Sequence, residues 1–138
     1  MVGGGELLEQ IKKSAQNLPI QFLGWVDKPF ENSGYFDLLL LTSKNEGMGL
    51  VMLEAANYKK STVARNVGGV GEFLKGGVNG LLVDNSPFEM ANEINSLTGE
   101  RLSKMGEASY QILVKDFTDK VMASNYLSLY NSLIKLKS

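Results

Sequence analysis

The sequence predicts an α/β fold, a Rossmann-like parallel sheet with helices on both faces. Helical and strand-like patterns alternate along the whole chain, as they do where parallel strands are joined by crossover helices. Glycine-containing turns separate several of these patterns. The chain has 138 residues, of which 43% are hydrophobic, which is enough for one well-filled core. Residues 1–138 are therefore expected to form a single domain.

The amino-terminal half is expected to begin with a helix. Leu7, Leu8, Ile11 and Ala15 recur at helical spacing, which predicts a helix over residues 6–17. The other elements expected in this half are strands over residues 20–25, 36–42 and 62–65 and a helix over residues 49–58.

The carboxy-terminal half is expected to be mostly helical. The Gly68-Gly69 pair makes the next turn from a strand to a helix. A strand over residues 81–83 is followed by helices over residues 87–97, 101–114 and 118–136. The last helix carries a stripe of apolar side chains: Val121, Tyr126, Leu129, Leu133 and Ile134. We expect this stripe to pack against another apolar surface.

Composition excludes several classes of function. Fourteen Lys and Arg residues against fifteen Asp and Glu residues leave no positive excess for a nucleic-acid backbone. The absence of cysteine and histidine removes disulfides, thiolate nucleophiles, imidazole bases and the usual zinc ligands. No Asp-x-Asp motif is present, so no metal or other cofactor is expected. No apolar run approaches the roughly twenty residues of a membrane span, and no signal-peptide pattern opens the chain. These features favour a cytoplasmic protein.

The segment between Glu46 and Glu54 carries the strongest indication of chemistry. It runs from a glycine-punctuated loop, which follows the expected strand 36–42, into an apolar helix. Open α/β sheets bind ligands at this edge, and the free amides and positive dipole end of a helix attract phosphate. Carboxylates would repel phosphate but are strong acceptors for hydroxyl groups. A ligand with phosphate in the middle and diols on both sides is a nucleotide sugar.

Five motifs in this order resemble the family 4 retaining glycosyltransferases, which have the two-Rossmann-domain (GT-B) architecture. They are Gly3-Gly4-Gly5, Phe22-Leu23-Gly24-Trp25, Ser43 to Glu54, Val67-Gly68-Gly69 with Glu72, and Asn79-Gly80-Leu81-Leu82-Val83. The resemblance covers nearly the whole chain and implies the carboxy-terminal, donor-binding half of a GT-B enzyme. The resemblance further implies an enzyme that transfers a hexosyl group from a nucleoside-diphosphate sugar to a glycan or lipid-linked acceptor in polysaccharide or glycoconjugate biosynthesis.

The resemblance implies a role for each residue of the segment. Glu54 accepts hydrogen bonds from the ribose hydroxyls, and Glu46 is the catalytic carboxylate nearest the transferred sugar, where it favours developing positive charge. The amides of Gly49 and Leu50, with Gly47 and Met48, contact the diphosphate. Ser43 faces the ligand, and Trp25 with Val26 lies beside the base. Family members retain the anomeric configuration without a well-placed nucleophile, and a front-face mechanism is the usual proposal.

Two positions depart from the family pattern. Lys59 and Ser61 stand where the family usually has a glycine and a proline, so the turn after the motif helix is expected to differ while the site survives. Met48 stands where an aromatic residue is common, which affects the preference for the sugar or the base.

The beginning of the chain indicates a fragment that is truncated at its amino-terminal edge. Only two residues precede the glycine turn, where a Rossmann half should begin with a strand, a helix and a second strand. In the resembled family the preceding part carries an arginine and a lysine that clamp the diphosphate, and the acceptor domain. The chain alone is therefore expected to be inactive, and the longer parent enzyme is expected to need no membrane span, although it could associate with a membrane peripherally.

Other functions stay open at this stage. The alternative to an enzyme half is a binding or regulatory module that senses a nucleotide sugar without turnover. Paired carboxylates also suggest a glycoside hydrolase, but the phosphate site between them argues against it. A nicotinamide site lacks the full glycine spacing and the acidic residue after the second strand. A response-regulator-like domain lacks the clustered acidic residues that bound magnesium needs.

Overall fold

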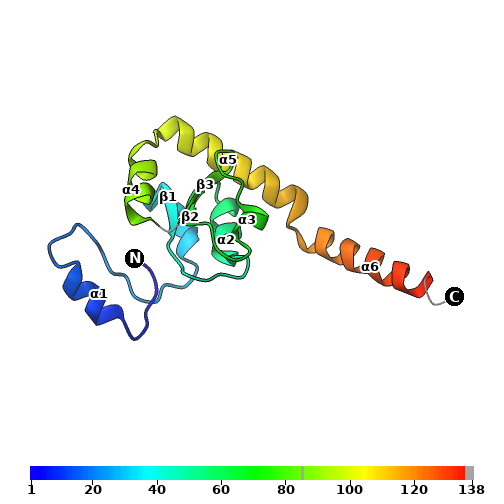
Figure 1. Ribbon diagram of the computed structural model, residues 1–138, viewed down its shortest axis with the longest axis horizontal. Coiled ribbons are helices and arrows are strands. Elements are labelled where there is room, and N and C mark those ends of the chain that lie inside the picture. The colour runs from blue at the N-terminus through cyan, green and yellow to red at the C-terminus, as the bar shows by residue number, and fades with distance from the viewer. Residues whose placement is uncertain (85, 136–138) are drawn as a thin grey trace. The chain divides into compact units, whose positions relative to one another are not determined.

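A computed structural model describes residues 1–84 and 86–135 (Figure 1). The chain divides into two compact units, Met1–Ser33 and Gly34–Ser138. Each unit is described separately below, and the 3-10 helix η1, Pro29–Tyr35, crosses the boundary between them.

The first unit contains a short helix and a short parallel pairing between two extended segments. Helix α1 spans Leu8–Ser14, which is shorter than the expected 6–17. The predicted strand over residues 20–25 is wrong, because no strand forms there. Instead, three backbone hydrogen bonds join residues 1–3 to residues 21–24, with donor–acceptor distances of 2.5 to 2.9 Å. The pairing is this short because Gly3 and Gly24 both have positive φ, which bends the chain out of extended geometry.

The second unit holds a three-stranded parallel sheet. Its strands are β1 (Leu38–Leu41), β2 (Ser61–Arg65) and β3 (Gly80–Val83), in the order β1-β2-β3. In the register, Leu39 lies opposite Thr62, and Thr62 lies opposite Gly80. Each strand matches a predicted one to within two residues at either end. Because both strand pairs are parallel, the carboxyl ends of all three strands lie at one edge of the sheet.

Helices connect and cover these strands. They are α2 (Leu50–Asn57), α3 (Val70–Phe73), α4 (Pro87–Asn95), α5 (Gly99–Asp116) and α6 (Asp119–Lys135). The hydroxyl of Ser86 caps α4 by accepting from the amide of Glu89 at 3.2 Å, and that of Thr98 caps α5 by accepting from the amide of Arg101 at 3.2 Å. An N-cap hydroxyl fixes the residue at which a helix begins, so Thr98 makes α5 a new helix that is separate from α4.

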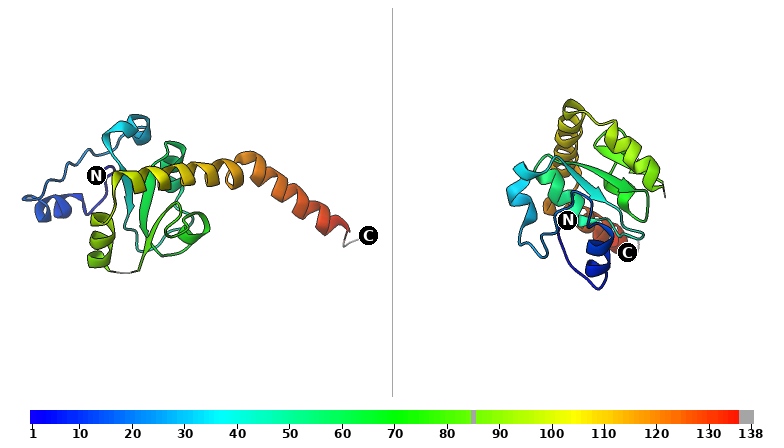
Figure 2. Two further views of the ribbon diagram at one scale, coloured as in Figure 1. Left: turned by 90° about the horizontal axis from the view of Figure 1, so that it is seen from above. Right: turned by 90° about the vertical axis from the view of Figure 1, so that its left-hand side faces the viewer.

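The core lies on both faces of the sheet. Successive residues of a strand point to opposite faces, and in β2 Val63 belongs to one buried cluster and Ala64 to the other. The cluster of Ala64 contains side chains of α2 and α3, whereas the cluster of Val63 contains Met90 of α4 and Met105 of α5. Helices thus cover both faces (Figure 2), and the predicted fold class is confirmed.

Asn79, which opens the last of the five motifs, is a structural residue. It is fully buried, and its side-chain oxygen accepts from the amide of Lys75 at 2.6 Å while its amide group donates to the carbonyl of Phe73 at 3.1 Å. The hydroxyl of Ser109 on α5 donates to the Asn79 carbonyl at 2.6 Å. Buried polar groups need such partners, so Asn79 fixes the entry to β3 against α3 and α5.

Helix α6 does not meet the expectation of packing over its length. It runs on from α5 and away from the sheet (Figure 2), and none of its described residues is buried. The side chains of Tyr126, Leu129 and Leu133 are each about half exposed. The stripe is therefore only partly covered by the described part of the second unit, and the predicted helix end at Leu136 lies outside the described residues.

Candidate functional site

The loop between β1 and α2 contains most of the predicted site residues. Two of them are in direct contact: the Ser43 hydroxyl donates a hydrogen bond to Oε1 of Glu46, with 2.6 Å between the oxygens. Both side chains are partly buried. An O–H···O bond of this length to a carboxylate is strong, so the loop holds the Glu46 side chain in one direction.

The loop ends at a helix terminus that no side chain caps. Gly49 is the N-cap residue of α2, with φ +74° in the left-handed region, and no side chain accepts from the first turn. The first amides of a helix have no acceptor one turn back, so those of Leu50 and Val51 lack an intrahelical partner. Together with the helix dipole they make this terminus attractive to an anion.

Close packing favours glycine at this N-cap in addition to φ. Gly49 is buried, and a methyl group there would lie 3.1 Å from Cε of Met52 and 3.3 Å from Cδ2 of Leu41. The loop backbone thus passes close to the end of β1 and the first turn of α2. Only glycine combines the positive φ with that close approach.

Glu54 lies one helical turn after Leu50 and is exposed. Its neighbours Ala55 and Ala56 are fully buried, as expected for a residue at the border of a buried helix face. Among the described residues, neither Glu54 nor Glu46 forms an ion pair with a lysine or an arginine. Two carboxylates without a cationic partner therefore flank the uncapped terminus, one in the loop and one on the helix.

The glycine turn after β2 lies directly against this loop. The amide of Gly69 donates to the carbonyl of Gly47 at 2.7 Å and, more weakly, to that of Glu46 at 3.4 Å. A methyl group on Gly68 would overlap the Glu46 carbonyl oxygen, and one on Gly69 would lie 2.5 Å from the Gly47 carbonyl oxygen. The sequence identified the pair only as a strand-to-helix turn. The contact could have been predicted from the order of the strands, because the loop follows β1, the glycine turn follows β2, and these two strands are parallel neighbours.

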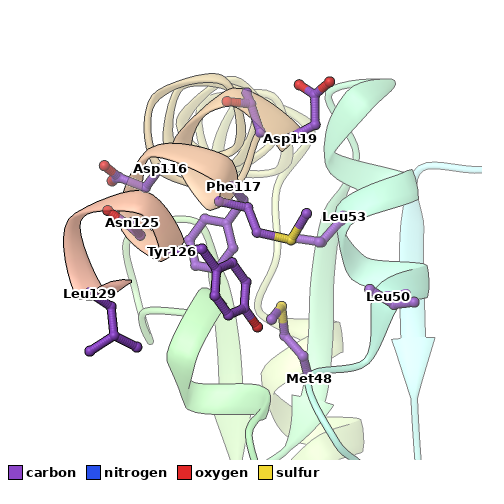
Figure 3. A pocket seen from close by; sticks show the side chains of 11 residues that line it. Met48, Leu50, Leu53, Asp116, Phe117, Asp119, Asn125, Tyr126 and Leu129 are labelled. Atoms are coloured by element: carbon purple, nitrogen blue, oxygen red, sulfur yellow. The ribbon is translucent and has the colours of Figure 1, made fainter. Parts of the chain in front are cut away.

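A pocket of about 590 Å³ lies beside the end of this loop (Figure 3). Met48 and Leu50 line it together with residues from α2 and from the junction of α5 and α6. The full lining is Met48, Leu50, Leu53, Asp116, Phe117, Thr118, Asp119, Met122, Asn125, Tyr126 and Leu129. Ser43, Glu46 and Glu54 do not line it. Of the predicted site residues, only Met48 and Leu50 contribute to the pocket wall.

The other two predicted site residues, Trp25 and Val26, belong to the first unit. Trp25 is 87% exposed and is therefore not a core residue, although a lone tryptophan usually is one. A methyl group on Gly4 would lie 3.0 Å from its indole nitrogen. The structure brings Ser43 and Glu46 together, whereas the placement of Trp25 and Val26 beside a bound base stays a prediction.

Two further observations concern metals and membranes. Within the described part of the chain, no three Asp or Glu residues gather closely enough to hold a metal ion. None of the helices formed by residues 1–84 and 86–135 combines the length and the apolar character of a bilayer span.

Comparison with known proteins gives consistent results. The family described as "Glycosyl transferases group 1" matches residues 1–100. The chain is 33% identical, over 135 residues, to the O-antigen biosynthesis glycosyltransferase WbnH of Escherichia coli, covering 97% of this chain and 37% of WbnH. It is 27% identical to the poly(ribitol-phosphate) alpha-N-acetylglucosaminyltransferase of Staphylococcus aureus, over 94% of this chain and 28% of that one.

Solved structures agree with the sequence matches. A variant of Staphylococcus aureus TarM in complex with UDP and other ligands superimposes with a TM-score of 0.86 at 26% identity, over 94% of this chain and 28% of TarM. Anabaena HepE in complex with UDP and glucose gives a TM-score of 0.79 at 26% identity, over 95% of this chain and 39% of HepE. The neighbours are GT-B glycosyltransferases, and the chain spans less than half of their length. With a family match over residues 1–100 and this fold, the chain belongs to the group 1 glycosyltransferases of GT-B architecture.

Proposed function

We propose that this chain is the donor-binding domain of a retaining glycosyltransferase that moves a hexosyl group from a nucleoside diphosphate onto a glycan or lipid-linked acceptor. The observation that carries the proposal is the loop from Ser43 to Gly49. In this loop Ser43 fixes the Glu46 carboxylate a few residues before the uncapped start of α2. The names of the relatives support a place in polysaccharide biosynthesis, since WbnH is named for O-antigen biosynthesis.

The diphosphate binds at the start of α2. The amides of Gly49 and Leu50, together with the backbone of Gly47 and Met48, offer donors where the helix dipole is positive. No carboxylate acts on the phosphate itself. UDP in the solved complexes of TarM and HepE supports a nucleoside diphosphate as the ligand class.

The two carboxylates bind the two ends of the donor. Glu54 lies about 6 Å along the helix axis from Leu50, since each residue of an α-helix advances about 1.5 Å. It is exposed and free to accept hydrogen bonds from the ribose hydroxyls. Glu46 precedes the phosphate-binding amides and stabilises positive charge that develops on the transferred sugar.

The longer enzyme supplies the rest of the cleft. The chain spans 37% of WbnH. We place the cations that clamp the diphosphate and the wall that positions the acceptor in the part of such an enzyme that the chain does not span. The isolated chain therefore binds nucleotide weakly, without a divalent metal, and does not transfer sugar, because half a cleft cannot position an acceptor or exclude water.

Binding by the isolated chain tests the donor site. Calorimetric titration with UDP and with GDP should give weak binding that persists in a chelator. Glu54→Ala should weaken binding by about 1.5–3 kcal/mol, the range for hydrogen bonds to a charged group. Glu93→Ala, which removes an exposed glutamate from α4, is the matched control and should leave the affinity unchanged. Equal affinities of Glu54→Ala and the unaltered chain, with the fold intact, would remove the ribose role.

Turnover by the longer enzyme tests Glu46. Glu46→Ala should depress kcat far more than affinity for the nucleotide, because the carboxylate acts on charge that exists only in the transition state. Sugar transfer from labelled UDP- and GDP-sugars is the assay, and product stereochemistry decides between retention and inversion. Binding of the donor without any transfer by the longer protein would instead indicate a nucleotide-sugar-binding module, and transfer by the 138-residue chain alone would refute the half-enzyme proposal.

A further inference from the structure

We infer that Ser43 and the Gly68-Gly69 turn are positioning residues that hold Glu46 in its working orientation, Ser43 through the side chain and the glycines through the backbone. The inference rests on the proposed function, because it assigns their effect to the carboxylate of Glu46. It also changes the role predicted for Ser43, which becomes a partner of Glu46 instead of a contact to the donor.

The side-chain contact occupies one carboxylate oxygen and leaves the other available. The Ser43 hydroxyl donates to Oε1 of Glu46 at 2.6 Å, and neither residue is fully exposed. A hydroxyl has a single proton, so a Ser43 that donates to Glu46 cannot donate to a phosphate at the same time. The geometry thus favours a fixed carboxylate with Oε2 directed elsewhere.

The backbone contact fixes the peptide that follows Glu46. The amide of Gly69 is shared between the carbonyls of Gly47 at 2.7 Å and Glu46 at 3.4 Å. Gly47 itself has no neighbour within 4 Å of where a side chain would begin. A loop with such a free glycine has many conformations available to it, so the hydrogen bond from the neighbouring turn selects one of them.

Both glycines of the turn are needed for this approach. Gly68 has φ +54°, and a methyl group on it would overlap the Glu46 carbonyl oxygen. The neighbour in this case is backbone and cannot rotate away as a side chain can. Any residue other than glycine at Gly68 therefore displaces the Glu46 loop, and catalytic groups lose much of their effect when they are displaced by about 1 Å.

Variants of Ser43 in the longer enzyme test the side-chain contact. Ser43→Ala should lower kcat about tenfold, the lower end of the effect of a hydrogen bond to a charged group, with KM for the donor within about twofold. Ser43→Thr keeps the hydroxyl and should retain most of the rate. An increase in KM at unchanged kcat would mean that Ser43 contacts the donor, and this would overturn the inference.

Coupling to Glu46 tests both contacts together. Ser43→Ala and Gly68→Ala should each slow the unaltered enzyme but have little further effect in a Glu46→Gln background, because their effect passes through that carboxylate. Gly71→Ala is the matched control: it adds the same methyl group two to three residues away, with only a side-chain oxygen of Asn66 near it at 4.0 Å, and should leave kcat unchanged.

The outcomes separate this inference from the proposed function. If Glu46→Gln alone leaves kcat unchanged, the catalytic role of Glu46 is wrong and the inference falls with it. If Glu46→Gln lowers kcat, and the Ser43 and Gly68 variants lower kcat by the same factor in that background as in the unaltered enzyme, only the positioning role is overturned. Should Gly68→Ala fail to fold by circular dichroism, the Ser43 variants still decide, since they change only a partly exposed hydroxyl.

Discussion

Helices α2 and α6 differ in a way that their lengths do not suggest. Helix α2 has eight residues, and Met52, Ala55 and Ala56 on it are fully buried. Helix α6 has seventeen residues, and none of those described is buried, although it carries many large apolar side chains. The shorter helix is therefore part of the core, and most of the longer one contributes little to it.

The difference follows from the neighbours of each helix. Helix α2 packs against β2 and α5, and small residues make the approach close: a methyl group on Gly106 of α5 would overlap the Lys59 carbonyl just after α2. Burial of apolar area stabilises a fold, whereas helix length alone does not. The candidate site is attached to the buried helix, which suits groups that must be held rigidly.

Truncation of one methionine in each helix tests the comparison most directly. Met52→Ala on α2 should lower the free energy of unfolding by about 2–5 kcal/mol, because it leaves a cavity in the core. Met122→Ala on α6, where the side chain is 58% exposed, should change it by less than about 0.5 kcal/mol. Urea unfolding of both variants provides the measurement. Equal losses would mean that α6 is buried in solution and that the contrast between the helices is wrong.

The close approach of α5 to the end of α2 gives the next largest effect. Gly106→Ala should destabilise by about 1–3 kcal/mol, since the backbone carbonyl of Lys59 has to move to admit the methyl group. Gly99→Ala, at the start of the same helix with nothing within 4 Å, is the control and should be neutral or slightly stabilising. Thermal unfolding of the two variants would show whether packing or helix propensity determines the change in stability. A stabilised Gly106→Ala would contradict the close packing of α2 against α5.

Sequence patterns predicted elements wherever a segment has neighbours that match its pattern. The three sheet strands and helices α2, α4 and α5 lie where they were expected, because their apolar faces are the buried ones. The strand predicted over residues 20–25 did not form because Gly3 and Gly24 bend the paired segments out of extended geometry, and the apolar stripe of α6 indicated a buried face that the described structure does not contain. Periodicity shows which face of a helix is apolar, but it does not show whether another surface buries that face.

The candidate site could be predicted only in part for a similar reason. Local order along the chain placed Glu46, Gly49 and Glu54 correctly on a loop, an N-cap and a helix. The contact of Gly68 and Gly69 with that loop joins two strand ends about twenty residues apart in sequence, and no local pattern encodes such an approach. One departure from the family pattern has a structural explanation: Lys59 has φ +55°, so a lysine adopts the left-handed conformation in which a glycine is usual.

The smallest expected effect is the pH dependence of the ion pair that joins the end of α2 to α5. The Lys59 ammonium lies 2.8 Å from Glu107, and both side chains are about half exposed. The hydrogen bond from Lys59, and a second one from Gln111, lowers the pKa of Glu107, and the same bond to Glu107 raises the pKa of Lys59 above its ordinary 10.5.

A lowered carboxyl pKa stabilises the fold above the unfolded value, near 4.5, and this stabilisation is lost as the pH falls through the folded value. A raised ammonium pKa stabilises below 10.5 and is lost as the pH rises through the folded value. The difference in unfolding free energy between the unaltered chain and Glu107→Gln should therefore be small and positive from about pH 5 to 10, vanish towards both extremes, and shrink in high salt because an exposed pair is screened. Urea unfolding across this pH range measures that difference, and a gap that persists at pH 2 would show that Glu107 acts through packing and not through its charge.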